Sequence, residues 1–253
     1  MDRLAFNAVV AINEARTARQ MTTNELANVS TPGFKRSFEA AMQAVKVEGP
    51  GFQSRMQPQA FTSDYINMTP GTPMTTGRDL DISMNNQTVL GVTAPDGKLA
   101  FTRRGDLKIN ANGALENGAG HLVQGQGGAA ITIPRGLMVT ISADGSVFAS
   151  DPAQVGVVRS VPVGQLMLRD TSKTPLQRTE SGLFQVVGKP GQDITPGPVP
   201  PSVTSRSLEG SNVNAMEVMV KMMSQSRSFE QQVNLIKESK LCDESGASMM
   251  KSS

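Results

Sequence analysis

The sequence predicts an α+β protein whose N- and C-terminal helices pair as a coiled-coil-like bundle, with an inserted all-β domain reached by extended linkers. Three observations predict this fold class. Long stretches near both ends lack Pro and Gly and place apolar residues at helical spacing. The middle of the chain has short β-branched runs separated by Asp-Gly and Asn-Gly pairs. Segments rich in Pro and Gly flank that middle on both sides.

Residues 1–36 are predicted to form the first helix and a turn motif. From Asp2 to about Ala27 there is no Pro or Gly, and small apolar residues recur in steps of three and four. This spacing places them along one face of a helix. Ser30-Thr31-Pro32-Gly33 then predicts the end of the helix and a turn.

Residues 208–242 are predicted to form the second helix, with Ser211 as its N-cap. Two sets of residues repeat every seven positions, as in a coiled-coil seam. They are Ala215, Met222, Phe229 and Ile236, and between them Met219, Ser226 and Val233. An ordinary helical hairpin within one chain explains this periodicity equally well. Residues 243–253 are expected to be a flexible tail.

Residues 79–190 are predicted to form the all-β domain. Apolar runs on both sides of Asp96-Gly97 predict a hairpin. Asn112-Gly113 and Asp144-Gly145 separate further runs of the same kind. Strands this short and this closely spaced predict a sandwich or an irregular barrel.

The two flanking segments, residues 37–78 and 191–207, are expected to be linkers. The first is polar and turn-rich, and the second contains Pro196-Gly197-Pro198 and Pro200-Pro201. Such composition favours extended backbone. Both ends of the chain would therefore return to one helical body, with the β domain between them.

Composition argues against nucleic acid and membrane as partners. The net charge is +2, from 24 basic and 22 acidic residues spread along the chain, so no basic stripe is present. A single Tyr and no Trp provide few rings for stacking bases. No apolar run approaches the roughly 20 residues of a membrane span. Asn13-Glu14 interrupts the longest early apolar run, so any export is expected to proceed without a cleaved signal peptide.

The sequence offers no catalytic, cofactor-binding or metal-binding residues, and we expect neither an enzyme nor a cofactor. The only histidine, His121, lies in a Gly-rich stretch that is typical of a solvated turn, and Cys242 has no neighbouring base. Asp79 and Asp81 are expected on the polar face of a strand rather than as paired catalytic acids. Gly125-Gln126-Gly127-Gly128 lacks the pattern of a phosphate-binding loop.

Two segments resemble the flagellar basal-body rod and hook family. Asn24–Arg36 is similar to that family's Asn-Asn-Leu-Ala-Asn-x-x-Thr-x-Gly-Phe-Lys motif, with Glu25 in place of the second Asn. Leu208–Asn214 resembles the C-terminal motif, and Phe101–Gly105 matches the central region. One departure is Asn85–Leu90, which replaces a usual Gly-x-Gly-Phe-Phe segment.

This resemblance implies a structural subunit of the periplasmic rod, most similar to proximal-rod members, that polymerises axially and transmits motor torque. The implied partners are other rod proteins, copies of itself and, during secretion, the flagellar type III export apparatus. A distal-rod or hook-type subunit, or a secreted β-domain binding module, are the alternatives. The seam and the motifs assign assembly contacts to Leu4, Ala8, Ile12, Ala15, Leu26, Asn28, Gly33, Phe34, Met219, Met222, Phe229, Val233 and Ile236.

Overall fold

The computed structural model describes residues 2–37, 41–46, 56–61, 65–152 and 160–251, and it is α+β as expected. The chain divides into two compact units. The helical unit comprises Met1–Asn28, Glu39–Ser63 and Asn214–Ser253, and the β unit comprises Val29–Phe38 and Asp64–Val213.

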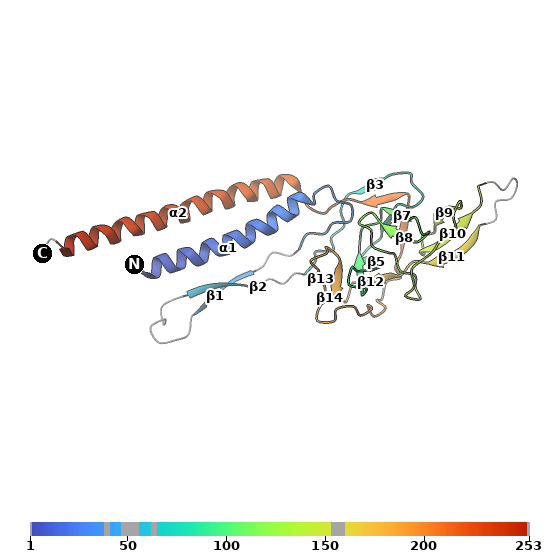
Figure 1. The fold of residues 1–253 in the computed structure, drawn as a ribbon, viewed down its shortest axis with the longest axis horizontal. Coiled ribbons are helices and arrows are strands. Elements are labelled where there is room, and N and C mark those ends of the chain that lie inside the picture. The colour runs from blue at the N-terminus through green and yellow to red at the C-terminus, as the bar shows by residue number, and fades with distance from the viewer. Residues whose placement is uncertain (1, 38–40, 47–55, 62–64, 153–159, 252–253) are drawn as a thin grey trace. The chain divides into compact units, whose positions relative to one another are not determined.

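The helical unit contains helix α1 (Asp2–Ala27), helix α2 (Ala215–Lys251) and a hairpin of strands β1 (Ala41–Lys46) and β2 (Met56–Phe61). The two helices run side by side in opposite directions (Figure 1). The absence of Pro and Gly through residue 27 predicted α1 with its observed bounds. Coiled-coil geometry between the helices stays a prediction.

Helix α2 differs from the sequence prediction at both ends. Its N-cap is Asn214 rather than Ser211, because the Asn214 Oδ1 accepts hydrogen bonds from the amides of Met216 (3.0 Å) and Glu217 (3.4 Å). Ser211 instead accepts from the amide of Val213 in the segment before the helix. At the other end the helix continues to Lys251, through residues that the sequence suggested were a flexible tail.

The largest sheet of the β unit has five antiparallel strands. Their order is β12 (Leu168–Asp170), β5 (Thr88–Thr93), β6 (Leu99–Thr102), β14 (Phe184–Val186) and β13 (Leu176–Arg178). The β5–β6 hairpin confirms the predicted Asp-Gly turn: Gly97 has a φ of 78°, which glycine adopts without strain, and the Ala94 amide donates to the Lys98 carbonyl at 2.9 Å.

Smaller sheets complete the β unit. One has three strands in the order β11 (Val161–Gln165), β10 (Ser146–Ser150) and β9 (Met138–Ile141). The two-stranded pairs are β7 (Leu107–Ile109) with β8 (Leu115–Asn117), β4 (Ile82–Met84) with β15 (Val203–Ser205), and β3 (Pro73–Thr75) with β16 (Ser207–Glu209). The hairpins expected around Asn112-Gly113 and Asp144-Gly145 are β7–β8 and β9–β10.

The β unit extends beyond the residues 79–190 that the sequence suggested. Strands β3, β15 and β16 lie in or beyond the segments expected to be linkers, and they pair across more than a hundred residues of chain. Ile194 and Val203, from the Pro-rich segment, are 2% and 1% exposed and belong to the apolar cores. A single apolar residue between prolines leaves no periodic pattern, so composition alone made this segment look like a spacer.

The two aspartates near the start of the β unit do not share the polar face of a strand. Asp79 lies in a turn, where its carboxylate pairs with the Arg206 guanidinium at 2.6 Å. Asp81 is buried and lies 3.2 Å from Arg78. Each carboxylate therefore has its own arginine. The expected alternation fails because the strand begins only at Ile82.

Candidate assembly site and buried charge cluster

The helical unit joins its two helices through polar as well as apolar side chains. The Gln225 amide nitrogen of α2 donates a hydrogen bond to the Thr22 hydroxyl of α1 at 3.1 Å. Thr22 is 1% exposed, and its hydroxyl also donates to the Ala18 carbonyl one turn earlier. A polar contact of this kind within a helix pair fixes which turns face each other, at some cost in stability.

The residues that the sequence assigned to assembly fall into two separate units. Gly33 and Phe34 belong to the β unit, and the others belong to the helical unit. Within the helical unit, Ile12, Ala15, Leu26, Asn28, Met222, Val233 and Ile236 are half-buried. Met219 and Phe229 are 45% and 40% exposed. The side chains of Leu4 and Ala8 lie outside the described residues.

Val218 is a buried position of α2 that sequence reasoning missed. It is 2% exposed, whereas Met219, the residue chosen for the predicted seam, is 45% exposed. Steps of seven from Val218 lead to Gln225 and Gln232, which are half-buried although they are polar. Because the prediction followed hydrophobicity, it chose the more apolar of two adjacent heptad rows.

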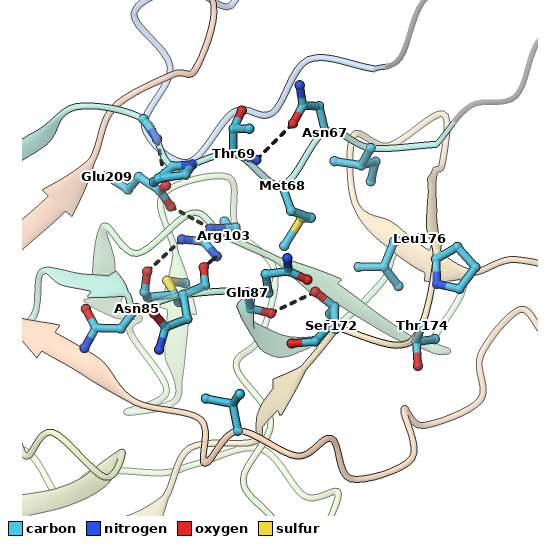
Figure 2. Close-up of a pocket in the computed structure, with 18 of the residues that line it drawn as sticks. Asn67, Met68, Thr69, Asn85, Gln87, Arg103, Ser172, Thr174, Leu176 and Glu209 are labelled. Carbon is cyan, nitrogen blue, oxygen red and sulfur yellow. Dashed lines mark hydrogen bonds and ion pairs between the residues drawn. The ribbon is translucent and has the colours of Figure 1, made fainter.

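The β unit contains a buried cluster of opposite charges made by three distant segments. Lys35, Arg103 and Glu209 are 0%, 1% and 4% exposed. The Lys35 Nζ donates to the Glu209 Oε1, and the Arg103 Nε donates to the Glu209 Oε2, both at 2.6 Å. One carboxylate therefore holds two cations (Figure 2 shows Arg103 beside Glu209).

Backbone carbonyls take up most of the remaining donors of this charge cluster. The Arg103 guanidinium donates to the carbonyls of Met84 (2.7 Å), Asn86 (2.7 Å) and Thr88 (3.0 Å). The Lys35 ammonium donates to the Thr69 carbonyl at 2.7 Å. Buried cations are tolerated when hydrogen bonds replace the lost water in this way.

Burial and the nearby positive charge of Arg103 nevertheless disfavour the protonated form of Lys35. Desolvation and the nearby Arg103 guanidinium lower the pKa of Lys35 from 10.5 to about 8. The hydrogen bond and the opposite charge of Glu209 act in the other direction and offset only part of the change. Lys35 is therefore partly neutral in mildly alkaline solution.

The same residues lie in the motifs that the sequence singled out. Gly33 lies close to the backbone of Glu209, and its amide donates to the Glu209 carbonyl at 2.7 Å. Its φ is 69°, and a Cβ there would lie 2.1 Å from the Arg103 carbonyl oxygen, so only glycine fits. The Asn212 side chain accepts from the Arg36 amide at 2.7 Å and donates to the Asn67 carbonyl at 3.0 Å. The N-terminal, central and C-terminal motifs thus meet at one place.

Sequence reasoning named Gly33 and Phe34 but missed Lys35, Arg103, Glu209 and Asn212. The available signal was a pair of opposite charges, Lys35 and Glu209, inside two motifs that carry few other charges.

The Phe34 ring is half-buried and lies 4.3 Å from the Arg178 guanidinium carbon, a cation–π arrangement.

An open hollow of about 1370 Å³ lies beside the charge cluster. Figure 2 shows that polar side chains such as Asn67, Asn85 and Gln87 line it, together with Met68 and Leu176. Of its three charged lining residues, Arg103 and Glu209 are already bonded to each other, and Lys173 is exposed. The arrangement offers structural contacts and no activated nucleophile.

Two other residues of reactive types, His121 and Cys242, lie after a turn and on helix α2. His121 follows a turn and its pKa is lowered by burial and by the charge of Arg104. Cys242 is exposed on α2. Among the described ranges, no group of three or more His, Cys, Asp or Glu side chains is placed to hold a metal ion, and no helix is long and apolar enough to cross a membrane.

Comparisons with known proteins match both units. Residues 84–149 match the model of the flagellar hook protein FlgE/F/G D1 domain, and residues 204–249 match that of the flagellar basal body rod FlgEFG protein C-terminal region. The chain is 35% identical to the flagellar basal-body rod protein FlgF of Escherichia coli and 34% identical to that of Salmonella typhimurium, covering 93% of each chain. It is 31% identical to FlgG of Buchnera aphidicola over 82% of this chain and 84% of that one.

The matched relatives are flagellar rod proteins and not enzymes, so the chain is a structural protein. The identity and coverage go further: the chain belongs to the family of flagellar basal-body rod proteins and is FlgF-like. It is accordingly a structural subunit of the basal-body rod.

Proposed function

We propose that this chain is a proximal-rod subunit that polymerises axially with other rod proteins and with copies of itself, and that it transmits motor torque by rigid packing. The observation that carries this proposal is the extent of the similarity to FlgF, which spans 93% of both chains. The FlgG relative matches at lower identity over a smaller share.

Exposed apolar residues on α2 support a polymerising role. Met216, Val220 and Met223 are 70%, 64% and 65% exposed, and steps of four and three place them on one face of the helix. An apolar helix face without cover is a typical protein-contact surface. Subunits that repeat head-to-tail along an axis would use such a face in a heterologous contact, which does not close into a ring.

The route and location of the protein belong to the same proposal. We place it in the periplasmic rod, reached through the flagellar type III export apparatus without a cleaved signal peptide and without insertion into a membrane. Family membership supports the basal-body location within this proposal. The export route is tested by whether loss of the apparatus leaves the chain in the cytoplasm.

The assembly role is tested by Phe229→Asp. Phe229 is 40% exposed, so a charge there should leave the single chain folded and block rod completion and motility. Asn234→Asp adds the same charge at an exposed position of the same helix and should leave motility intact. Circular dichroism checks the fold, and electron microscopy of isolated basal bodies counts completed rods. Rotating rods containing the Phe229 variant would contradict the assignment of this residue.

The position along the rod is tested by cryo-electron microscopy of purified basal bodies. Density for this chain between the export apparatus and the distal rod is the expected result. Density further out would favour the distal-rod or hook-type alternative.

A further inference from the structure

Residues 29–37, which we call the strap, belong to the β unit although the chain on both sides belongs to the helical unit. Val29–Phe38 is grouped with the β unit, whereas Met1–Asn28 and Glu39–Ser63 are grouped with the helices. The chain therefore enters the β unit, stays for a few residues and leaves again. The strap must therefore be held on the β unit by the contacts of its own few residues.

Polar contacts hold the strap, whereas the apolar cores lie elsewhere. The buried residues of both cores lie between Ile66 and Val203. The strap contributes the Gly33 amide, the Lys35 ammonium and the Arg36 amide to hydrogen bonds of 2.6–2.7 Å with Glu209 and Asn212. An attachment made of buried polar groups depends strongly on the charge that those groups carry.

Two buried cations of the charge cluster face a single carboxylate at the strap. Lys35 and Arg103 share the Glu209 carboxylate, and Arg178 donates to the backbone carbonyl of Lys35. Arginine stays protonated at any accessible pH, so Lys35 is the cation of this cluster that can change its charge. Desolvation by burial, and after it the charge of Arg103, lowers the pKa of Lys35 to about 8.

We propose that the strap is a proton-sensitive joint: it binds the β unit more tightly when Lys35 loses its proton and less tightly when the proton returns. A neutral amine keeps two hydrogens, which suffice for the contacts with the Glu209 Oε1 and the Thr69 carbonyl. Arg103 and Glu209 then remain as a balanced buried pair.

The direction of the effect follows from proton linkage. In a detached strap Lys35 is in water, where its pKa is the ordinary 10.5, and in the attached strap it is about 8. Between these two values the detached state binds more protons than the attached state. Raising the pH through this window therefore favours attachment, by up to about tenfold per pH unit.

Amide hydrogen exchange of the full chain tests the proposal. Protection factors, corrected for the intrinsic exchange rate, are measured with short labelling pulses from about pH 7 to about pH 10. We expect protection of the Gly33 and Arg36 amides to rise by up to about tenfold per pH unit above about pH 8. The Gly91 amide, which donates to the Met167 carbonyl at 2.8 Å inside the β unit, should change little.

Two variants separate a proton effect on Lys35 from other causes. Lys35→Met cannot titrate and Lys35→Arg keeps its charge, so strap protection should be independent of pH in both. A pH response in either variant equal to that of the wild type would overturn the proposal, as would a flat response in the wild type. Should either variant fail to fold, nuclear magnetic resonance titration of the Lys35 side chain in the wild type decides: a pKa near 10.5 would also overturn it.

Discussion

At the scale of single residues, Glu209 has the most demanding position in the β unit. Its carboxylate accepts from Lys35, Arg103 and the Gly71 amide, and its carbonyl accepts from Gly33. Two buried cations therefore depend on one anion. Removing the anion and removing a cation should then have very different consequences.

Glu209→Gln is expected to lower the free energy of unfolding by roughly 3–5 kcal/mol, because it leaves Lys35 and Arg103 buried without a counter-charge. Lys35→Met should cost much less, because it leaves a balanced pair. The double variant should be more stable than Glu209→Gln alone, because only one cation then lacks its partner. Urea unfolding at neutral pH measures all three, and strictly additive losses would contradict a shared carboxylate.

Glycine is required at position 33 both because a side chain has no room there and because the backbone φ is positive. Gly77 is the matched control. Both have positive φ, 69° and 78°, but a Cβ at Gly77 would meet nothing within 4 Å. Gly77→Ala should therefore cost only the conformational strain, about 1–2 kcal/mol. Gly33→Ala must also move the backbone at Arg103, so its loss in urea unfolding should be clearly larger. Equal losses would show that the close approach is unimportant.

At the scale of elements, long periodic segments and turn pairs were predictable, and short or polar elements were not. Residues 2–27 gave α1 because nothing interrupts their helical spacing, and Asp96-Gly97 gave a hairpin because the turn needs a positive φ. The three-residue strands β3, β15 and β16 are too short to show an alternation. Their pairing depends on partners more than a hundred residues away.

The charge cluster was hidden from sequence reasoning for a related reason. Lys35, Arg103 and Glu209 are far apart in sequence, and buried charges look the same as solvated charges until their partners are known. Gly33 and Phe34 could be named because they stand in a motif. Their contact partners, which lie far away in the sequence, could not be named in the same way.

Helix α2 offers an element-scale test of which heptad row is buried in the single chain. Val218 is 2% exposed and Met219 is 45% exposed. Val218→Ala should lower the free energy of unfolding by roughly 1–3 kcal/mol through lost burial, whereas Met219→Ala should change it little. Thermal unfolding of the two variants makes the comparison. If Met219 contributes to assembly as proposed, its variant should show a motility defect without a stability defect.

At the scale of the whole molecule, the β unit is discontinuous in sequence. It needs Val29–Phe38 from one side of the chain and residues up to Val213 from the other. The middle of the chain cannot complete its own fold, because the strands that cover β3 and β4 come from residues 203–209. The strap and residues 203–209 must therefore both be present before the β unit is closed.

Two fragments test this dependence. A fragment of residues 79–190, the β domain suggested by the sequence, loses Val203 and Ile194 from the cores and leaves Arg103 buried without Glu209. It should show no cooperative thermal transition in circular dichroism, because an uncompensated buried cation and two incomplete cores together exceed the small net stability of a domain. A fragment of residues 29–213 retains the strap, both cores and the complete charge cluster, and should unfold cooperatively. Cooperative unfolding of the shorter fragment would show that the strap and the C-terminal strands are attachments to the β unit rather than parts of it.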